Sequence, residues 1–156
     1  MRTLEALFDH NRWANERLLD GCRGLTAAQF ETAVPGTYGD LGATLAHIAS
    51  GEVYYTQLLT HWKPPKGWQQ NDPFPGVDPL LDVVRETGRR LMAAAETMPG
   101  DHLIERDPGE MIPAAVIFVQ AIDHATEHRA HARTILTQIG VTPPDVDGWS
   151  HGGVPG

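Results

Sequence analysis

Residues 113–140, PAAVIFVQAIDHATEHRAHARTILTQIG, form the stretch of sequence that decides the fold. Apolar side chains recur along it every three or four residues, which is the period of an amphipathic helix. Pro113 suits the start of a helix, and Gly140 suits its end because glycine readily adopts the left-handed conformation found there. The sequence therefore predicts a long helix from about Pro113 to Ile139, with its apolar face buried.

Three histidines, His124, His128 and His131, lie on this apolar face at positions i, i+4 and i+7. At ~100° per residue they fall within about 60° of one another. Burial of several unpaired imidazoles is costly, and a metal ion would satisfy them. His124 and His131, however, lie ~10 Å apart along the helix axis, too far for two ligands that each bind one ion at ~2.0–2.1 Å. We therefore expect His124 and His128 to be ligands and His131 to lie behind the site or at its rim.

A third ligand must come from another helix, and His47 is the best candidate. It lies midway along a predicted helix from about Leu41 to Trp62, for which Asp40 is a suitable N-cap. Gly51, one turn further on, leaves space beside the imidazole. Taken alone, a histidine in this position is more often a hydrogen-bonded core residue than a ligand. The prediction depends on its combination with the histidine pair on the other helix.

Two more helices complete a predicted all-α four-helix bundle. The first runs from about Thr3 to Cys22, and the third begins at Asp78-Pro79, with Asp78 as N-cap, and stops before Pro99-Gly100. The stretch from Lys63 to Val77 is rich in proline and predicts a long loop that crosses the end of the bundle. We expect one domain over residues 1–156, with a single turn capped by Thr26, an irregular tail from about residue 145 and no β-sheet.

Composition excludes several classes of function. Twelve Lys and Arg stand against twenty Asp and Glu, a formal net charge of -8, and no basic run exists to bind nucleic acid. No apolar run approaches the ~20 residues that cross a bilayer. Cys22 is the single cysteine, which is typical of a reducing compartment. We expect a soluble, cytoplasmic protein that acts on a small molecule and binds neither nucleic acid nor membrane.

The remaining histidines carry less information. His10, His61, His102 and His151 are expected at loops or helix ends, exposed to solvent. Residues 124–128 also match the H-x-x-E-H pattern of inverted zinc proteases. We discount this match because the chain has no plausible third ligand downstream and no strand that would align a peptide.

Taken together, these residues resemble the DinB-like (DinB/YfiT) superfamily of metal-binding four-helix bundles. Three blocks carry the resemblance: NRWANERLL at 11–19, LAHI at 45–48 and DHATEHR at 123–129. The ending GVTPPDVD at 140–147 is also similar. The sequence departs from the family pattern at His131, where a Gln is expected.

The resemblance implies an up-down-down-up bundle with the long crossover between helices 2 and 3. It implies a homodimer and a divalent metal, zinc or nickel, on His47, His124 and His128. Relatives such as the bacillithiol S-transferases and mycothiol-dependent maleylpyruvate isomerase suggest a metal-dependent S-transferase that uses a low-molecular-weight thiol. A non-enzymatic metal-binding stress protein or interaction module, and a metal-dependent hydrolase, remain as alternatives. Asp123 and Glu127 either orient an imidazole N–H or are surface carboxylates.

Overall fold

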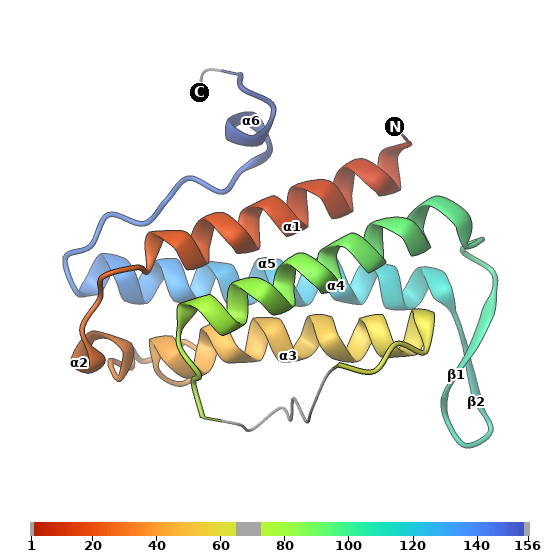
Figure 1. Ribbon diagram of the computed structural model, residues 1–156, viewed down its shortest axis with the longest axis horizontal. Helices are drawn as coiled ribbons and strands as arrows, with labels where there is room; N and C mark the ends of the chain where they lie inside the picture. The colour runs from red at the N-terminus through yellow and green to blue at the C-terminus, as the bar shows by residue number, and fades with distance from the viewer. Residues whose placement is uncertain (1, 65–72, 155–156) are drawn as a thin grey trace.

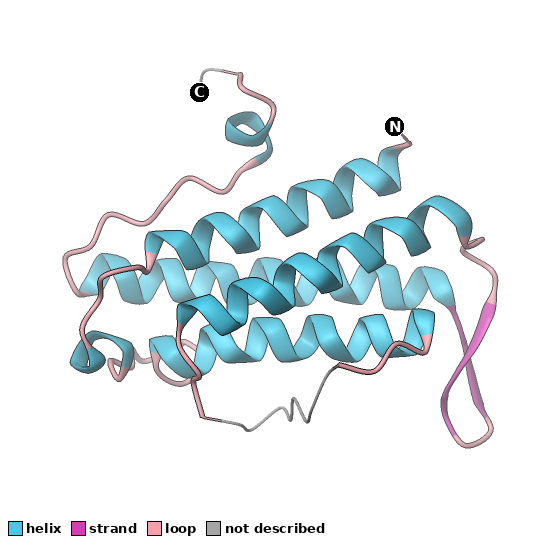
Figure 2. Ribbon diagram, in the orientation of Figure 1, coloured by secondary structure: helices cyan, strands magenta, loops and turns pink. Residues whose placement is uncertain are grey.

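The protein is a bundle of four long helices, described by a computed structural model over residues 2–64 and 73–154 (Figure 1). The elements in chain order are α1 Thr3–Gly21, α2 Ala27–Phe30, α3 Leu41–Thr60, α4 Val77–Thr97, β1 Leu103–Asp107, β2 Glu110–Pro113, α5 Ala114–Gln138 and α6 Gly148–His151. Figure 2 shows that α1, α3, α4 and α5 make up most of the molecule. None of these helices is long and apolar enough to cross a membrane within the described ranges.

The four long helices follow the expected up-down-down-up order. In Figure 1, α3 and α4 run in the same direction, while α1 and α5 run in the opposite one. Helix α1 packs mainly against α4, and α3 packs against both α5 and α4. The end of α3 and the start of α4 lie at opposite ends of the bundle. Most of the loop predicted at Lys63–Val77 lies outside the described residues, but the parallel helices on either side of it confirm the predicted topology.

Local capping explains where several helices begin and end. Oδ1 of Asp40 accepts a hydrogen bond of 2.7 Å from the backbone N–H of Ala43, as expected for the N-cap of α3. The side chain of Thr26 caps the single turn of α2 in the same way. Pro113 precedes the first residue of α5, and Gly140 follows its last turn with φ of 76°. These predicted boundaries are confirmed.

Helix α4 begins earlier than predicted. Its N-cap is Gly76, with φ of 99°, and Asp78 and Pro79 are its second and third helical residues. Pro79 is tolerated there because the first four N–H groups of a helix have no partner within the helix. Asp78 lies in the first turn, where a carboxylate interacts favourably with the helix dipole, and it also pairs with Arg23 at 2.7 Å.

The expectation of no sheet is wrong at one point. Strands β1 and β2 form an antiparallel hairpin that leads into α5, with an irregular register between Glu105 and Asp107. Ile104 is the buried residue of β1, and no residue of β2 is fully buried. With so little of the hairpin facing the core, no alternation of apolar and polar residues marks it in the sequence.

The tail after α5 also differs from expectation, because it packs back onto α1. Val146 is buried, and Nε2 of His10 donates a hydrogen bond of 2.9 Å to its carbonyl oxygen. His151, in the single turn of α6, lies 3.3 Å from a carboxylate oxygen of Asp9. His10 and His151 are therefore partly buried and not exposed, and His10 lies in the middle of a helix. His61 and His102 are exposed, as predicted.

The core consists of two apolar clusters separated by polar residues. One cluster includes Leu18 and Leu45, and the other includes Phe8 and Phe118. In each of the four long helices, buried polar residues lie between the segments that feed the two clusters. These residues are Asn11, Asn15, Ser50, Glu52, Thr87, His128 and Arg129, whereas the buried Thr44, His47 and Thr56 lie within the segments of α3 that feed the clusters.

Candidate metal centre

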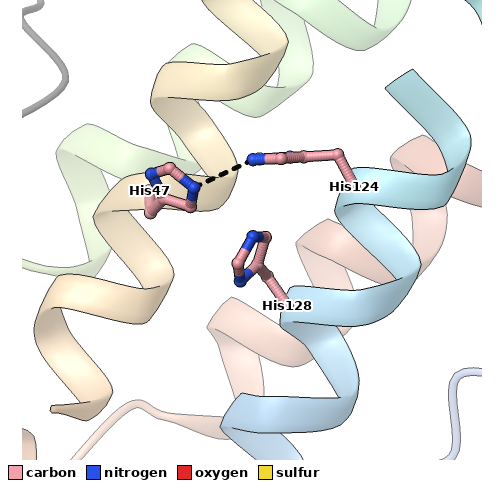
Figure 3. A group of neighbouring side chains, drawn as sticks. All are labelled: His47, His124 and His128. Atoms are coloured by element: carbon pink, nitrogen blue, oxygen red, sulfur yellow. Dashed lines mark hydrogen bonds between the residues drawn. The ribbon is translucent and has the colours of Figure 1, made fainter. Parts of the chain in front are cut away.

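The fold brings His47, His124 and His128 together at the middle of the bundle. His47 projects from α3 towards His124 and His128 on the neighbouring helix α5 (Figure 3). Nε2 of His47 lies 3.0 Å from Nε2 of His124, and each of the three rings offers a nitrogen within 4.8 Å of the others. Two nitrogens bound to one ion at ~2.0–2.1 Å lie at most about 4 Å apart, so this cluster is close to the spacing of a shared ion.

Gly51 is the residue that leaves space for His124. A Cβ atom at position 51 would lie 2.7 Å from Nδ1 of His124 and 3.1 Å from its Nε2. The sequence predicts this space beside His47, on the same helix. The structure instead fills it with the imidazole that approaches from α5.

The three imidazoles lie in surroundings that favour their neutral form. His47 and His128 are buried and His124 is partly buried. Burial lowers the pKa of all three, and for His124, where the neighbouring His128 and His47 add to the effect, it lowers the pKa to about 4. Neutral imidazole is the form that coordinates a metal ion. The donor set of three nitrogens therefore fits a borderline divalent cation such as zinc or nickel.

The second nitrogen of each ring has no hydrogen-bond partner. Nδ1 of His47, His124 and His128 is buried and unpaired among the described residues. Asp123 and Glu127 are exposed, and none of the hydrogen bonds of the described chain joins them to these rings. They are surface carboxylates in this structure, which is the second of the two interpretations given above.

His131 lies beside the cluster without joining it. Its ring centroid is 5.3 Å from that of His128, and its buried Nδ1 has no partner. The group of nitrogens within 4.8 Å of one another contains the other three histidines and not His131. This position agrees with the helical geometry that separates it from His124 by nearly two turns.

Tyr38 is a neighbour of the cluster that sequence reasoning missed. Its ring stacks on that of His47, with centroids 4.0 Å apart and planes at 15°, and meets the edge of His128 at 5.1 Å. The loop before α3 is fixed in part by Thr44, whose hydroxyl donates a hydrogen bond to the Tyr38 carbonyl oxygen. No periodicity marks a residue in such a loop, so the sequence carried no signal for it.

A cavity of about 340 Å³ opens onto the histidines on the side of α3 that faces α5. His47 and His124 both line it, together with Gly51, Tyr54 and Gln57. Its volume lies at the small end of the range for ligand sites. The cluster therefore has space beside it for a small molecule.

A buried polar network holds together the four helices behind the histidines. Oε1 of Glu52 accepts hydrogen bonds of 2.7 Å from Nδ2 of both Asn11 and Asn15, and Oε2 accepts one of 2.7 Å from the hydroxyl of Thr87. Nη1 of Arg129 donates to Oδ1 of the same two asparagines, at 2.6 Å and 2.8 Å. Each asparagine thus bridges the carboxylate and the guanidinium, and its amide orientation is determined from both ends.

This network is buried enough to shift the pKa values of its charged members. Burial raises the pKa of Glu52 to about 7, against the hydrogen bond from Thr87 and the charge of Arg129. Burial lowers the pKa of Arg129 to about 10, against the charge of Glu52. Arg129 follows the ligand candidate His128 directly, and Glu52 follows Gly51. The network therefore fixes the two helix segments that carry the histidines.

Comparison with known proteins agrees with this arrangement. The sequence pattern of the DinB family matches residues 1–152. The chain belongs to the DinB family. A crystal structure of a DinB-like protein from Bacillus cereus superposes with a TM-score of 0.68 at 18% sequence identity, over 89% of this chain and 92% of that one. At this identity the likeness is one of fold, and it supports the DinB-like bundle described above. No protein of curated function matches the sequence.

Proposed function

We propose that this DinB family protein binds a divalent metal ion through His47, His124 and His128 and uses it in the transfer of a low-molecular-weight thiol. The observation that carries the proposal is the convergence of three neutral imidazoles from two helices, two of them buried and that of His124 partly buried. Their unpaired Nδ1 atoms show that no other part of the described chain satisfies these rings. Burial of polar rings without partners is unfavourable unless a ligand compensates for it.

The number of protein ligands favours a reactive site over a structural one. Within the described residues the cluster offers three nitrogens and no fourth His, Cys, Asp or Glu ligand. Structural zinc sites are typically closed by four protein ligands, whereas catalytic sites keep a position free. The cavity of about 340 Å³ beside His47 and His124 would give a small molecule access to that position.

A bound divalent ion lowers the pKa of a thiol or water that occupies its free position. The chain itself supplies the neutral imidazoles and the cavity that admits the thiol, and it covers one face of His47 with Tyr38. In the transfer, a bond forms between the thiol sulfur and a carbon of the substrate, the bond from that carbon to its leaving group breaks, and the thiol proton passes to solvent. This reaction needs no further side-chain base.

The experiment combines metal analysis with an activity assay. The purified protein is stripped with a chelator, loaded separately with zinc and nickel, and assayed with bacillithiol, mycothiol or cysteine and 1-chloro-2,4-dinitrobenzene as electrophile. We expect the protein to bind metal stoichiometrically and to form the thioether only when metal is bound. His128→Ala should remove this activity. Metal-dependent ester hydrolysis without thioether formation would favour the hydrolase, and tight metal without either activity would favour the non-enzymatic metal-binding protein.

A further inference from the structure

We propose that a second cleft, on the far side of Tyr38, binds the apolar body of a neutral or cationic organic ligand. Its identification as the electrophilic substrate rests on the function proposed above, whereas the binding itself does not. The cleft has a volume of about 860 Å³, within the range that holds a drug-sized molecule. It lies between α2, the first turns of α3 and the residues 73–76 that precede α4.

The walls of this cleft are mainly apolar and aromatic. Leu25, Phe30, Tyr38 and Phe74 line it, and the rings of Phe30 and Phe74 pack with centroids 4.6 Å apart. A Cβ atom at Gly42 would lie 3.1 Å from Phe74, so this glycine allows the ring to pack close to α3. Such walls offer an aromatic or alkyl group a surface to pack on.

The charged residues in the described lining of the cleft are all acidic. Glu31 and Asp40 line it, and its described lining includes no Lys, Arg or His. The chain as a whole is also acidic, with a formal net charge of -8. A carboxylate, sulfonate or phosphate on the ligand would therefore be repelled, while a neutral or cationic ligand would not.

Tyr38 connects this cleft with the histidines. Tyr38 lines the cleft, and its ring stacks on that of His47 with centroids 4.0 Å apart. Ala46, the neighbour of His47 in the chain, also lines the cleft. A ligand in contact with Tyr38 would thus be separated from the candidate metal ligands by a single aromatic ring. This juxtaposition identifies the cleft as a candidate substrate pocket beside the metal centre.

The test uses two fluorescent probes that differ in one charged group. N-phenyl-1-naphthylamine is neutral, and 8-anilinonaphthalene-1-sulfonate adds a sulfonate to the same rings. We expect the neutral probe to bind the metal-free protein about tenfold or more tightly than the anionic one. Equal affinities would overturn the proposal. Binding of the neutral probe should persist in His128→Ala, so failure of the metal site and failure of the cleft are distinguishable.

Two matched lysine substitutions locate the probe. Ala43 is exposed and lines the cleft. Ala43→Lys should therefore weaken binding of the neutral probe and reduce the difference in affinity between the neutral and the anionic probe. Val119 is 69% exposed beside a separate apolar groove between α1 and α5, so Val119→Lys should leave both affinities unchanged. Loss of binding in Val119→Lys and not in Ala43→Lys would overturn the proposal.

Proton NMR of the histidine rings tests the connection with the metal centre. The neutral probe should shift the imidazole signal of His47, assigned with His47→Ala, because Tyr38, which lines the cleft, stacks on that ring. The signal of the exposed His102 should not move, because this residue directly precedes β1, which lies at the other end of the bundle from α2 (Figure 1). A probe that binds the cleft and leaves the His47 signal unchanged would contradict the placement of this pocket beside the metal centre.

Discussion

The imidazole of His124 occupies the space that the missing side chain of Gly51 leaves on α3. A Cβ atom at Gly51 would lie 2.7 Å from Nδ1 of His124, closer than real side-chain contacts allow. The helix that carries His47 therefore also determines whether a ring from α5 can approach it. The candidate metal centre therefore depends on a glycine that is not itself a candidate ligand.

Gly51→Ala should weaken metal binding by about 10–100-fold, the usual effect of disturbing the residues around a ligand. The added methyl group would displace the His124 ring from its position opposite His47. Gly42→Ala on the same helix is the control, since it adds the same methyl group and its new Cβ meets Phe74 and no histidine. Isothermal titration with zinc compares the two variants. Equal affinities would show that His124 has another position from which to bind.

The buried network predicts different effects for two buried threonines. Thr87→Val removes the donor to Oε2 of Glu52 and should cost about 1–3 kcal/mol of unfolding free energy. Thr56 is equally buried, but its hydroxyl has no hydrogen-bond partner, so Thr56→Val should change stability by less than about 0.5 kcal/mol or increase it. Urea unfolding measures both. A loss in Thr56→Val as large as that in Thr87→Val would contradict the network as described.

The metal-free protein should lose stability through His124 as the pH falls. The folded state lowers the pKa of His124 from 6.5 to about 4, so between these values the unfolded chain binds more protons. The stability of the folded state is free of this effect above about pH 6.5, and it decreases as the pH falls from there towards 4. Glu52, whose pKa is raised to about 7, acts in the opposite direction. The pH dependence of the parent protein's stability therefore does not by itself report on His124. Thermal unfolding of the parent and His124→Phe, compared from pH 4.5 to 7, isolates the histidine: the variant should lose less stability on acidification.

Chelation should lower the melting temperature of the metal-loaded parent protein. An ion bound only by the folded state stabilises it by mass action, by about 2.7 kcal/mol at a free concentration one hundred times the Kd. His128→Ala, with two of the three candidate ligands left, should melt at the same temperature with and without chelator. Differential scanning fluorimetry at one protein concentration makes the comparison. A chelator that also shifts His128→Ala would point to ions bound elsewhere.

Much of the bundle follows from local signals in the sequence. Asp40 and Gly140 were recognised as a helix start and a helix end because capping depends on the residue itself and its immediate neighbours. The position of the histidines on the apolar stripe of α5 likewise follows from helical periodicity. The hairpin was missed because β1 and β2 bury almost nothing, although Pro108-Gly109 between the strands is a recognisable turn sequence.

Contacts between helices were much harder to predict. Asn11 lies on the buried face of α1 and bonds to Glu52 and Arg129, which come from α3 and α5. Glu52 in turn accepts a hydrogen bond from Thr87 on α4. No local rule connects residues at these sequence separations. Tyr38 was missed for the same reason, since it reaches His47 from a loop. His47 itself was recognised because a pair of histidines elsewhere required a third partner.

The metal content of two single variants tests the central claim most directly. His128→Ala should purify with no stoichiometric metal, because two ligands are too few to hold a divalent ion against water and buffer. His131→Ala should keep about one ion per chain, because His131 lies outside the group of converging nitrogens. Elemental analysis of both, after identical loading with zinc and desalting, gives the answer. Loss of the ion in His131→Ala together with its retention in His47→Ala would place the site along α5 and contradict the triad.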